Sequence, residues 1–216
     1  MITPKSASEQ LLFSSVRIEA IGSNGSQSVG TEFFFSYRID DQRNLPVIIT
    51  NKHVIAGAQS GRICFHEAEH AEEGIKPSGK YLRILLNDFE TRWLLHPAEE
   101  IDLCAMFINP ITSEVKSSLG KEIYTMALDE TLIQSDTQLE NLSAVEDILM
   151  FGYPIGLWDS VNNPPIIRRG ITASHPALDF EGKSITVIDG LVFRDLQDLR
   201  SSLLMKVVTA QKMDLL

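Results

Sequence analysis

The sequence has few cysteines and no long apolar segment. Its 216 residues include only Cys64 and Cys104, too few for a disulfide-rich secreted scaffold. No stretch approaches the roughly 18 to 20 uninterrupted apolar residues of a membrane-spanning helix, and the first residues, Met1 to Ser6, are polar. We therefore expect a soluble, cytoplasmic protein with two reduced thiols, a single disulfide being the less favoured alternative.

Basic residues are also scarce. The chain has 19 Lys and Arg against 29 Asp and Glu, a formal net charge of -10. This charge repels nucleic acid and anionic membranes, so neither is expected as a partner. The complete phosphate-binding motifs Gly-x-Gly-x-x-Gly and Gly-x-x-x-x-Gly-Lys-Ser/Thr do not occur, and Gly152 and Gly156 suit turns. No cofactor is indicated.

Short apolar runs that are rich in strand-forming residues recur through the chain between turn residues. This pattern is typical of β-sandwiches and β-barrels and predicts an all-β fold. The expected strands are Val16 to Ile18, Thr31 to Tyr37, Val47 to Thr50, Tyr81 to Leu86, Leu103 to Ile108, Ile148 to Gly152, Ile166 to Ser174 and Ser184 to Phe193.

Helical signals are weak by comparison. Asn51 to Ala58 is expected to form one short turn that Gly57 closes, and Glu67 to Glu73 an exposed acidic loop or helix fragment. Asn109 to Gly120 has no β periodicity and is interpreted as a linker between two strand-rich halves. Residues 194–216 lack Gly and Pro and are expected to be a marginal helix or disordered.

Two residues at the ends of predicted strands are candidates for chemistry. His53 follows the buried run Val47 to Thr50 and precedes a tight turn, where a rigid scaffold can fix an imidazole at the edge of a cleft. Asp102 comes directly before another apolar strand. Taken singly, a structural histidine and a strand-capping aspartate are the simpler interpretations. A serine hydrolase requires a histidine that accepts the serine proton and a carboxylate that orients the imidazole.

Four segments resemble those of trypsin-like serine peptidases, in the same order along the chain. They are Gly30 to Phe34, Thr50 to Ile55, His96 to Ala105, and Met150 to Trp158 with the following Pro165 to Ala173. The resemblance spans about Val16 to Phe193. It implies peptide-bond hydrolysis by acyl transfer, with a peptide or protein as substrate, His53 as general base and Asp102 as its orienting partner.

The same resemblance implies a chymotrypsin-like fold of two β-barrels with an incomplete second barrel. We expect an N-terminal extension over residues 1–15, a first barrel over 16–112, a partial second barrel over 113–193 and an unrelated tail over 194–216. An incomplete barrel exposes strand edges and apolar interior, so partial order or aggregation is expected in the second half.

The Gly-x-Ser-Gly segment that carries the serine and the oxyanion hole in these peptidases is absent. A strand ending in Asp189-Gly190 is present, but Arg194 follows Phe193. One C inserted after the Phe193 codon gives a frame that can read Phe-Pro-Gly-Ser-Ser-Gly-Ser-Pro-Val, with the proline obligatory in these codons. We hypothesise a single-base deletion in the gene or in its sequencing. Four other serines are unfavourable substitutes for the nucleophile: Ser174, Ser184, Ser201 and Ser202.

Three other interpretations remain open. One is a non-catalytic peptide-binding or scaffold domain, and another is an all-β structural domain in which His53 and Asp102 never meet. The spacing of His66, Glu67 and His70 would suit a metal site on a helix, but an exposed acidic loop explains these residues as well. The sequence indicates neither the substrate preference nor the oligomeric state.

Overall fold

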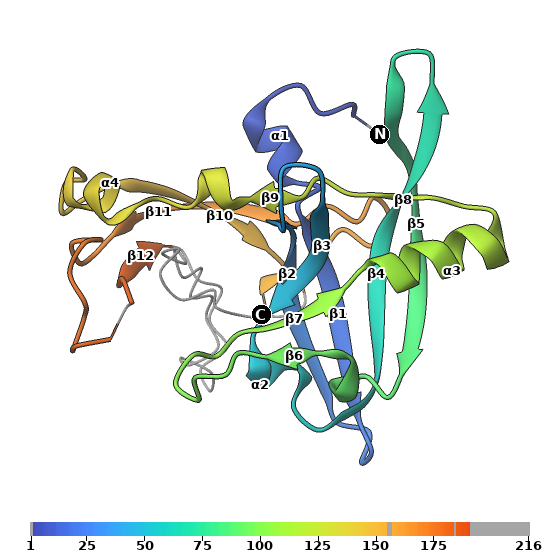
Figure 1. Cartoon of the computed structure of the whole chain (residues 1–216), viewed down its shortest axis with the longest axis horizontal. Coiled ribbons are helices and arrows are strands. Elements are labelled where there is room, and N and C mark those ends of the chain that lie inside the picture. The colour runs from blue at the N-terminus through green and yellow to red at the C-terminus, as the bar shows by residue number, and fades with distance from the viewer. Residues whose placement is uncertain (1, 155–156, 184, 191–216) are drawn as a thin grey trace.

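The computed structural model describes residues 2–154, 157–183 and 185–190. Its strands are β1 (Ser15–Gly22), β2 (Gln27–Arg38), β3 (Asn44–Thr50), β4 (Ala58–Ala71), β5 (Gly74–Asn87), β6 (Leu94–Leu95), β7 (Cys104–Phe107), β8 (Ile123–Tyr124), β9 (Leu128–Asp129), β10 (Asp147–Gly152), β11 (Ile166–Thr172) and β12 (Ile188–Gly190). The α-helices are α1 (Ala7–Leu11), α2 (Lys52–Ile55), α3 (Asn109–Leu119) and α4 (Asp136–Glu140), with 3-10 helices η1 (Glu90–Arg92) and η2 (Glu130–Leu132). Strands dominate and nearly all pairings are antiparallel, which confirms the predicted all-β class (Figure 1).

The larger sheet has nine strands. Its main path runs β5-β4-β1-β2-β3-β7-β6, with β8 added to β4 and β9 to β2. The β1–β2 register places Val16 opposite Glu32 and Ile18 opposite Gly30. The β3–β7 register places Thr50 opposite Cys104. The last residue of β3 therefore lies beside the first residue of β7. The segment that follows β3 and the segment that leads into β7 are close together for this reason.

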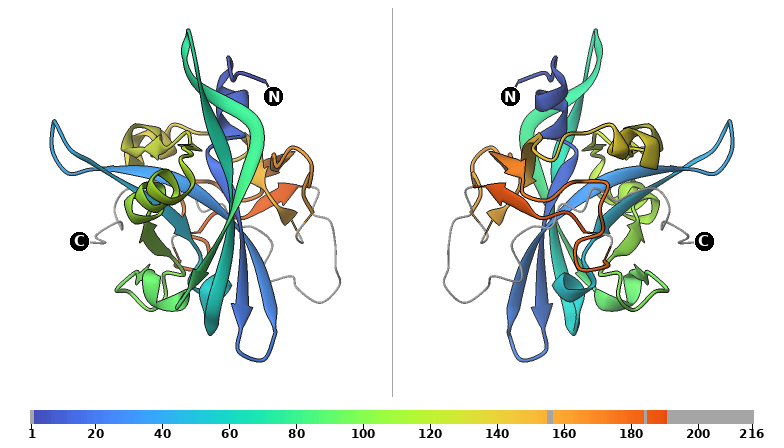
Figure 2. Two further views of the ribbon diagram at one scale, coloured as in Figure 1. Left: turned by 90° about the vertical axis from the view of Figure 1, so that its right-hand side faces the viewer. Right: turned by 90° about the vertical axis from the view of Figure 1, so that its left-hand side faces the viewer.

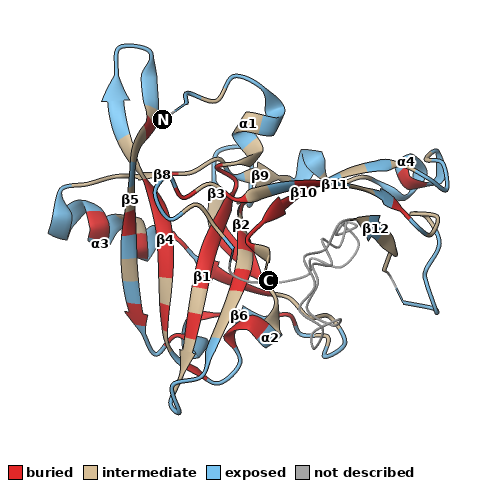
Figure 3. Cartoon of the chain, turned by 180° about the vertical axis from the view of Figure 1, so that it is seen from behind, coloured by how far each residue is buried: buried red, intermediate tan, exposed pale blue. Residues whose placement is uncertain are grey.

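One apolar core lies against this sheet. Alternate residues of β1, among them Val16, Ile18 and Ala20, point to the same face and are buried. The same cluster takes side chains from β2, β3, β4, β5 and β7 and from helices α2 and α3. Because strands across the whole sheet contribute to one cluster, the sheet must curl around it. Figure 3 shows this burial along the central strands.

The hairpin of β4 and β5 differs from the prediction for Glu67 to Glu73. β4 continues to Ala71 and pairs with β5 to the tip, where Ala71 lies opposite Gly74, so the interpretation as a loop or helix fragment was wrong. A bulge between His66 and Ala68 shifts the register. An ion pair across the hairpin, from Lys76 Nζ to Glu69 Oε1 at 3.2 Å, joins polar residues of the two strands beyond the core. The hairpin projects from the sheet in Figure 1.

The segment predicted to be a linker forms helix α3. Pro110 lies in its first turn, where a missing N–H is tolerated, and Gly120 ends it with φ 62°. Ile111 and Val115, one turn apart, are buried against the core of the larger sheet. Asn109 to Gly120 is therefore ordered secondary structure, because these two side chains give the segment an apolar stripe.

The second sheet has three strands in the order β10-β11-β12. β10 and β11 lie within the strands expected at Ile148 to Gly152 and Ile166 to Ser174, apart from the extra residue Asp147. Of the strand expected over Ser184 to Phe193, the structure gives β12 at Ile188–Gly190. Ser184, Leu191 to Phe193 and the tail over 194–216 lie outside the described residues. Figure 2 shows this sheet beside the curled one.

The connection from β10 to β11 packs on the outer side of the larger sheet. The guanidinium of Arg17 lies 4.6 Å from the ring centroid of Trp158. The hydroxyl of Tyr81 donates to the carbonyl of Ser160 at 2.9 Å, and Nδ2 of the fully buried Asn163 donates to the carbonyl of Cys64 at 3.2 Å. These contacts attach the second sheet to β1, β4 and β5.

Two short strands after α3, β8 and β9, pair with strands of the larger sheet. The division at residues 112 and 113 into two barrels stays a prediction. Among the described residues, no helix is long and apolar enough to cross a membrane.

Candidate functional site

His53 is held by the short helix that follows β3. The apolar run of β3 is buried, and α2 begins immediately after Asn51, whose backbone is extended at φ -84° and ψ 143°. Val54 and Ile55 point into the core and anchor the turn. His53, in the same four-residue helix, is left on the exposed side. The predicted turn at Asn51 to Ala58 is confirmed, with Gly57 at φ 70°.

Asp102 is held by the segment that leads into β7. Cys104 pairs with Thr50 across the sheet, so Asp102 lies next to the start of α2. The side-chain amide of Asn51 donates to the carbonyl of Asp102 at 2.6 Å. Nζ of Lys52 donates to the carbonyl of Ala98 at 2.9 Å. These two bonds attach the loop before β7 to the helix that carries the histidine.

The structure brings His53 and Asp102 together. Nδ1 of the imidazole lies 2.6 Å from Oδ2 of the carboxylate, and the backbone N–H of His53 donates to Oδ1 at 3.1 Å. Both carboxylate oxygens are thus used by one residue, 49 positions away in sequence. The side chains are 50% and 40% exposed, so this pair contributes more to orientation than to stability.

This geometry sets the tautomer of the imidazole. A carboxylate accepts at Nδ1, which places the ring proton there and leaves Nε2 with a lone pair. Nε2 is then the atom able to accept a proton from a hydroxyl group. This is the arrangement required of a general base whose orientation a carboxylate fixes.

His66, Glu67 and His70, which were considered for a metal site, each contact a different residue. His66 is buried, and its Nε2 lies 3.5 Å from Nδ2 of Asn163. Nε2 of His70 lies 2.9 Å from a carboxylate oxygen of Glu122, and Glu67 accepts from Lys121 at 2.8 Å. Within residues 2–154, 157–183 and 185–190, no group of three His, Cys, Asp or Glu residues could hold a metal ion.

Both cysteines are free, buried thiols, as predicted. Burial raises the pKa of Cys64, and it raises the pKa of Cys104 to about 12. The thiolate is the nucleophilic form of cysteine, so neither thiol suits nucleophilic catalysis at neutral pH. Cys104 donates instead to the carbonyl of Thr50 at 3.6 Å, close beneath the histidine segment.

Among the described residues, no serine forms a hydrogen bond with His53, whose Nδ1 and backbone N–H both bond to Asp102. Ser174 follows β11, and its hydroxyl accepts from the backbone N–H of Val187 at 2.8 Å, within the second sheet region. Ser184, Ser201 and Ser202 lie outside the described residues.

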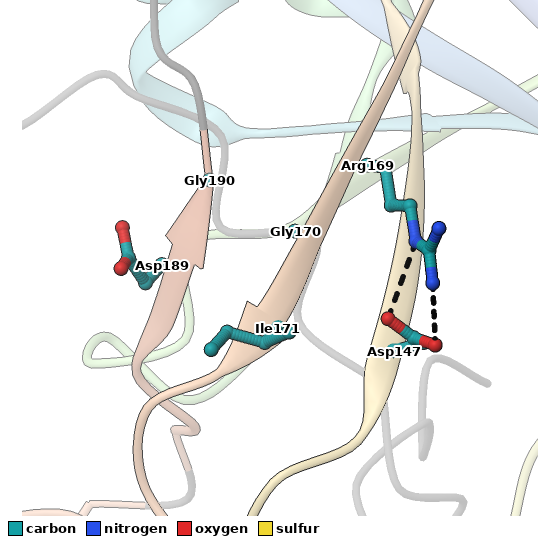
Figure 4. Close-up of a pocket in the computed structure, with 6 residues that line it drawn as sticks. All are labelled: Asp147, Arg169, Gly170, Ile171, Asp189 and Gly190. Carbon is teal, nitrogen blue, oxygen red and sulfur yellow. Dashed lines mark hydrogen bonds and ion pairs between the residues drawn. The ribbon is translucent and has the colours of Figure 1, made fainter.

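A pocket lies on the second sheet, apart from the His53–Asp102 pair (Figure 4). It is an open depression of about 460 Å³, lined by Asp147, Arg169, Gly170, Ile171, Asp189 and Gly190. Arg169 donates to both carboxylate oxygens of Asp147, at 3.2 and 2.7 Å, which compensates that charge. Its lining includes neither His53 nor Asp102, so it is no part of their site.

Sequence reasoning missed two residues next to the pair. The side-chain amide of Asn51 donates to the carbonyl of Asp102. The sequence indicated this residue by its position between a buried strand and the histidine. Glu32 is fully buried next to Thr50. Its signal was a carboxylate at an alternate position of β2, between Gly30 and Phe34, where an apolar side chain is expected. All three residues lie on the buried face of the strand.

Comparison with known proteins gives fold-level similarities of low score. A scan against protein-family models and a search of curated proteins gave no match. Among solved structures, the chain is similar to an HtrA-type protease, AlgW, with a tripeptide, at 13% identity and TM-score 0.36 over 81% of this chain. That match spans 40% of the AlgW chain. Deg5 is similar at 18% identity and TM-score 0.43, over 85% of this chain and 71% of its own. Both TM-scores lie below 0.5, a level at which similarity does not establish a shared fold.

Proposed function

We propose that this chain is a homologue of trypsin-like serine endopeptidases, with His53 as general base and Asp102 as its orienting carboxylate. The observation that carries the proposal is the 2.6 Å contact between Nδ1 of His53 and Oδ2 of Asp102. It joins two segments, Thr50 to Ile55 and His96 to Ala105, that resemble the corresponding peptidase segments. The chance pairing of a structural histidine with a capping aspartate does not account for both resemblances.

The chemistry assigned to the pair is a proton transfer in acyl transfer. Nε2 of His53 takes the proton of a serine hydroxyl as its oxygen bonds to the carbonyl carbon of the peptide. The carbonyl electron pair moves to oxygen, and the new imidazolium is stabilised by Asp102. When the C–N bond breaks, Nε2 returns the proton to the leaving nitrogen. Water repeats the cycle and releases the acid.

The serine that this chemistry requires is proposed to lie in another reading frame. Restoring one C after the Phe193 codon allows Phe-Pro-Gly-Ser-Ser-Gly-Ser-Pro-Val, which contains the Pro-Gly-x-Ser-Gly-x-Pro segment of the family. Its second serine would be the nucleophile, and the surrounding backbone N–H groups would form the oxyanion hole. The chain as written is then inactive, because loss of the serine alone costs about 10^6-fold in turnover in one such enzyme.

Later codons of the same frame add support. In this frame, one codon consists of the last base of the Lys212 codon and the first two bases of the Met213 codon, and it encodes Asn or Asp. The next codon consists of the last base of the Met213 codon and the first two bases of the Asp214 codon. These bases are GGA in every case, so the codon always encodes Gly. Asn-Gly and Asp-Gly are the strongest short signals of a β-hairpin, as a second barrel requires. The frame also contains no obligatory stop codon.

The gene sequence tests this proposal first. Resequencing the codons of Asp189 to Ser202 should reveal the additional C, and the restored chain should cleave a fluorescent protein substrate that the present chain leaves intact. Substituting the second serine of the restored segment by Ala should abolish the cleavage, while Asp102→Asn should lower it about 10^4-fold. Codons incompatible with the Pro-Gly-Ser-Ser-Gly reading would sink the frameshift proposal.

A second candidate function is a non-catalytic peptide-binding domain. It is favoured by one observation: the His53–Asp102 pair is intact, while no serine in the described ranges is hydrogen-bonded to His53. An unchanged gene sequence, together with binding of peptides from an immobilised library by the present chain, would support it. His53→Ala should then leave the chain folded and alter the peptides selected.

A further inference from the structure

Glu32 is a fully buried carboxyl group in the larger sheet. It lies in β2 with an exposed fraction of 0%, and it faces the same side as Gly30 and Phe34. Removing a carboxyl group from water without a charged partner or several hydrogen bonds is costly. A residue of this kind in a position that an apolar side chain would fill requires an explanation in the surrounding contacts.

The contacts of Glu32 lead to the segment that carries His53. The hydroxyl of Thr50, the last residue of β3, donates to Oε1 of Glu32 at 3.0 Å. A Cβ atom on Gly30 would lie 2.5 Å from the same Oε1 and 2.7 Å from Cγ1 of Val54. The absence of a side chain at Gly30 therefore leaves the space in which the carboxyl group approaches helix α2.

Along the chain, Thr50 and Val54 lie on either side of His53. Val54 follows His53 in α2, and Thr50 precedes Asn51, whose amide donates to the carbonyl of Asp102 at 2.6 Å. The carbonyl of Thr50 also accepts from Cys104, two residues after Asp102. Glu32 is thus bonded to Thr50, the residue at which the histidine segment pairs with the segment that follows Asp102.

We propose that Glu32 is a positioning residue, which fixes the His53–Asp102 hydrogen bond through Thr50. The proposal extends the function proposed above, because it supplies the buried support of its general base. Glu32 has no role in proton transfer to substrate; it acts through the Thr50 hydroxyl that donates to it.

The charge state of Glu32 suits this role. Desolvation raises the pKa of its carboxyl well above the usual range, although the bonds from Thr50 and Ile18 and the charge of Arg17 oppose the shift. Burial also raises the pKa of Cys104 and of Tyr153, on both of which the charge of Glu32 acts. The raised pKa favours the uncharged acid, which still accepts the bond from Thr50. Glutamine reproduces its shape and its acceptor.

A short imidazole–carboxylate hydrogen bond gives a test that does not require turnover. The Nδ1 proton of His53 should appear as a far-downfield resonance in the proton NMR spectrum of the full chain as written. Its loss in both His53→Asn and Asp102→Asn would assign it. Because the measurement needs neither serine nor substrate, the result is independent of whether the chain is a peptidase.

Four variants then test the support by Glu32. Glu32→Ala and Thr50→Val should lose the resonance while the dispersed amide spectrum persists, and Glu32→Gln should retain it. Thr172→Val is the matched control: Thr172 is a buried threonine whose hydroxyl donates to the carbonyl of Ala144, far from His53 in the chain, and its loss should leave the resonance unchanged.

The result that overturns the proposal is an unchanged resonance in folded Glu32→Ala or, if that variant does not fold, in Thr50→Val. Loss of the resonance in Glu32→Gln or in the Thr172→Val control also contradicts it, as does a wild-type chain with no such resonance.

Discussion

The two sheets use similar strands but bury them to different extents. Ile18 and Ile63 in the larger sheet are 0% exposed, whereas Ile167 and Leu149 in the smaller sheet are 46% and 50% exposed. In both sheets alternate residues point to opposite faces. The difference therefore lies in what covers each face. The larger sheet curls over its own core with α3 against it, while one face of β10 and β11 carries apolar side chains that the described residues leave open to solvent.

This difference in burial indicates that the formation of a strand and the burial of its side chains depend on separate parts of the sequence. β10 and β11 form from their own residues and pair over six positions. Burial of Leu149 and Ile167 requires further segments, which the proposed reading frame would supply. The buried residues of the larger sheet's core all lie between Val16 and Val115, and Ile123 packs against them.

Of the changes considered, restoring the reading frame should have the largest effect. It should remove the difference in burial between the two sheets. In limited proteolysis of the chain as written, we expect cleavage first between β11 and β12, with residues 15–129 surviving longest. The restored chain should be protected beyond Gly190, because its last strands would cover the open face. Mass spectrometry of the fragments measures both. Equal protection past Phe193 in the two chains would contradict this explanation.

A matched pair of isoleucines tests burial directly. Ile18→Ala should lower the free energy of unfolding by about 2–5 kcal/mol, the range for large-to-small substitutions in a packed core. Ile167→Ala, the same chemical change on the exposed face, should lower it by less than about 0.5 kcal/mol. Urea unfolding followed by circular dichroism provides both values. Similar losses for the two variants would show that the face of β11 is covered in solution.

Acidification should weaken the attachment of the smaller sheet to the larger one. Burial lowers the pKa of His66 to about 4, while the unfolded chain takes up this proton near 6.5. The unfolded state therefore binds more protons between these values, and stability is lost as the pH falls from 6.5 towards 4. The full effect is about 3 kcal/mol.

His66→Phe isolates this contribution, because Phe keeps a ring beside Phe13, whose centroid lies 4.9 Å from that of His66. The difference in unfolding free energy between wild type and variant should change between pH 7 and pH 4. A constant difference would mean that His66 is accessible to protons in the folded chain, through opening of its contact with Asn163.

The smallest effect is expected for the ion pair on the open sheet. Asp147 and Arg169 are bidentate but largely exposed, and solvent screens such pairs. Asp147→Asn should leave the unfolding midpoint of the chain as written unchanged within error, in low and in high salt. A clear salt-dependent loss would indicate that this face is more enclosed than the described residues show.

Part of the fold was readable from local patterns. Runs of strand-forming residues predicted most long strands, but β4 was missed because Gln59 to Ala71 mixes polar, charged and apolar residues without alternation. Only its pairing with both β1 and β5 makes that segment a strand. Helix α3 was missed although Pro110, the Ile111–Val115 spacing and Gly120 were present, since the polar residues between them favoured a linker.

The sequence by itself determined the all-β class, the turn that presents His53 and the two segments that resemble peptidase motifs. Those are local properties, fixed by side-chain shape, backbone preference and spacing. Tertiary structure alone decided that Asp102 lies 2.6 Å from His53 and that the Thr50 hydroxyl donates to the buried Glu32. Such contacts join residues far apart in the chain, and they depend on the β3–β7 register and on a sheet curled around one core, which no local pattern specifies.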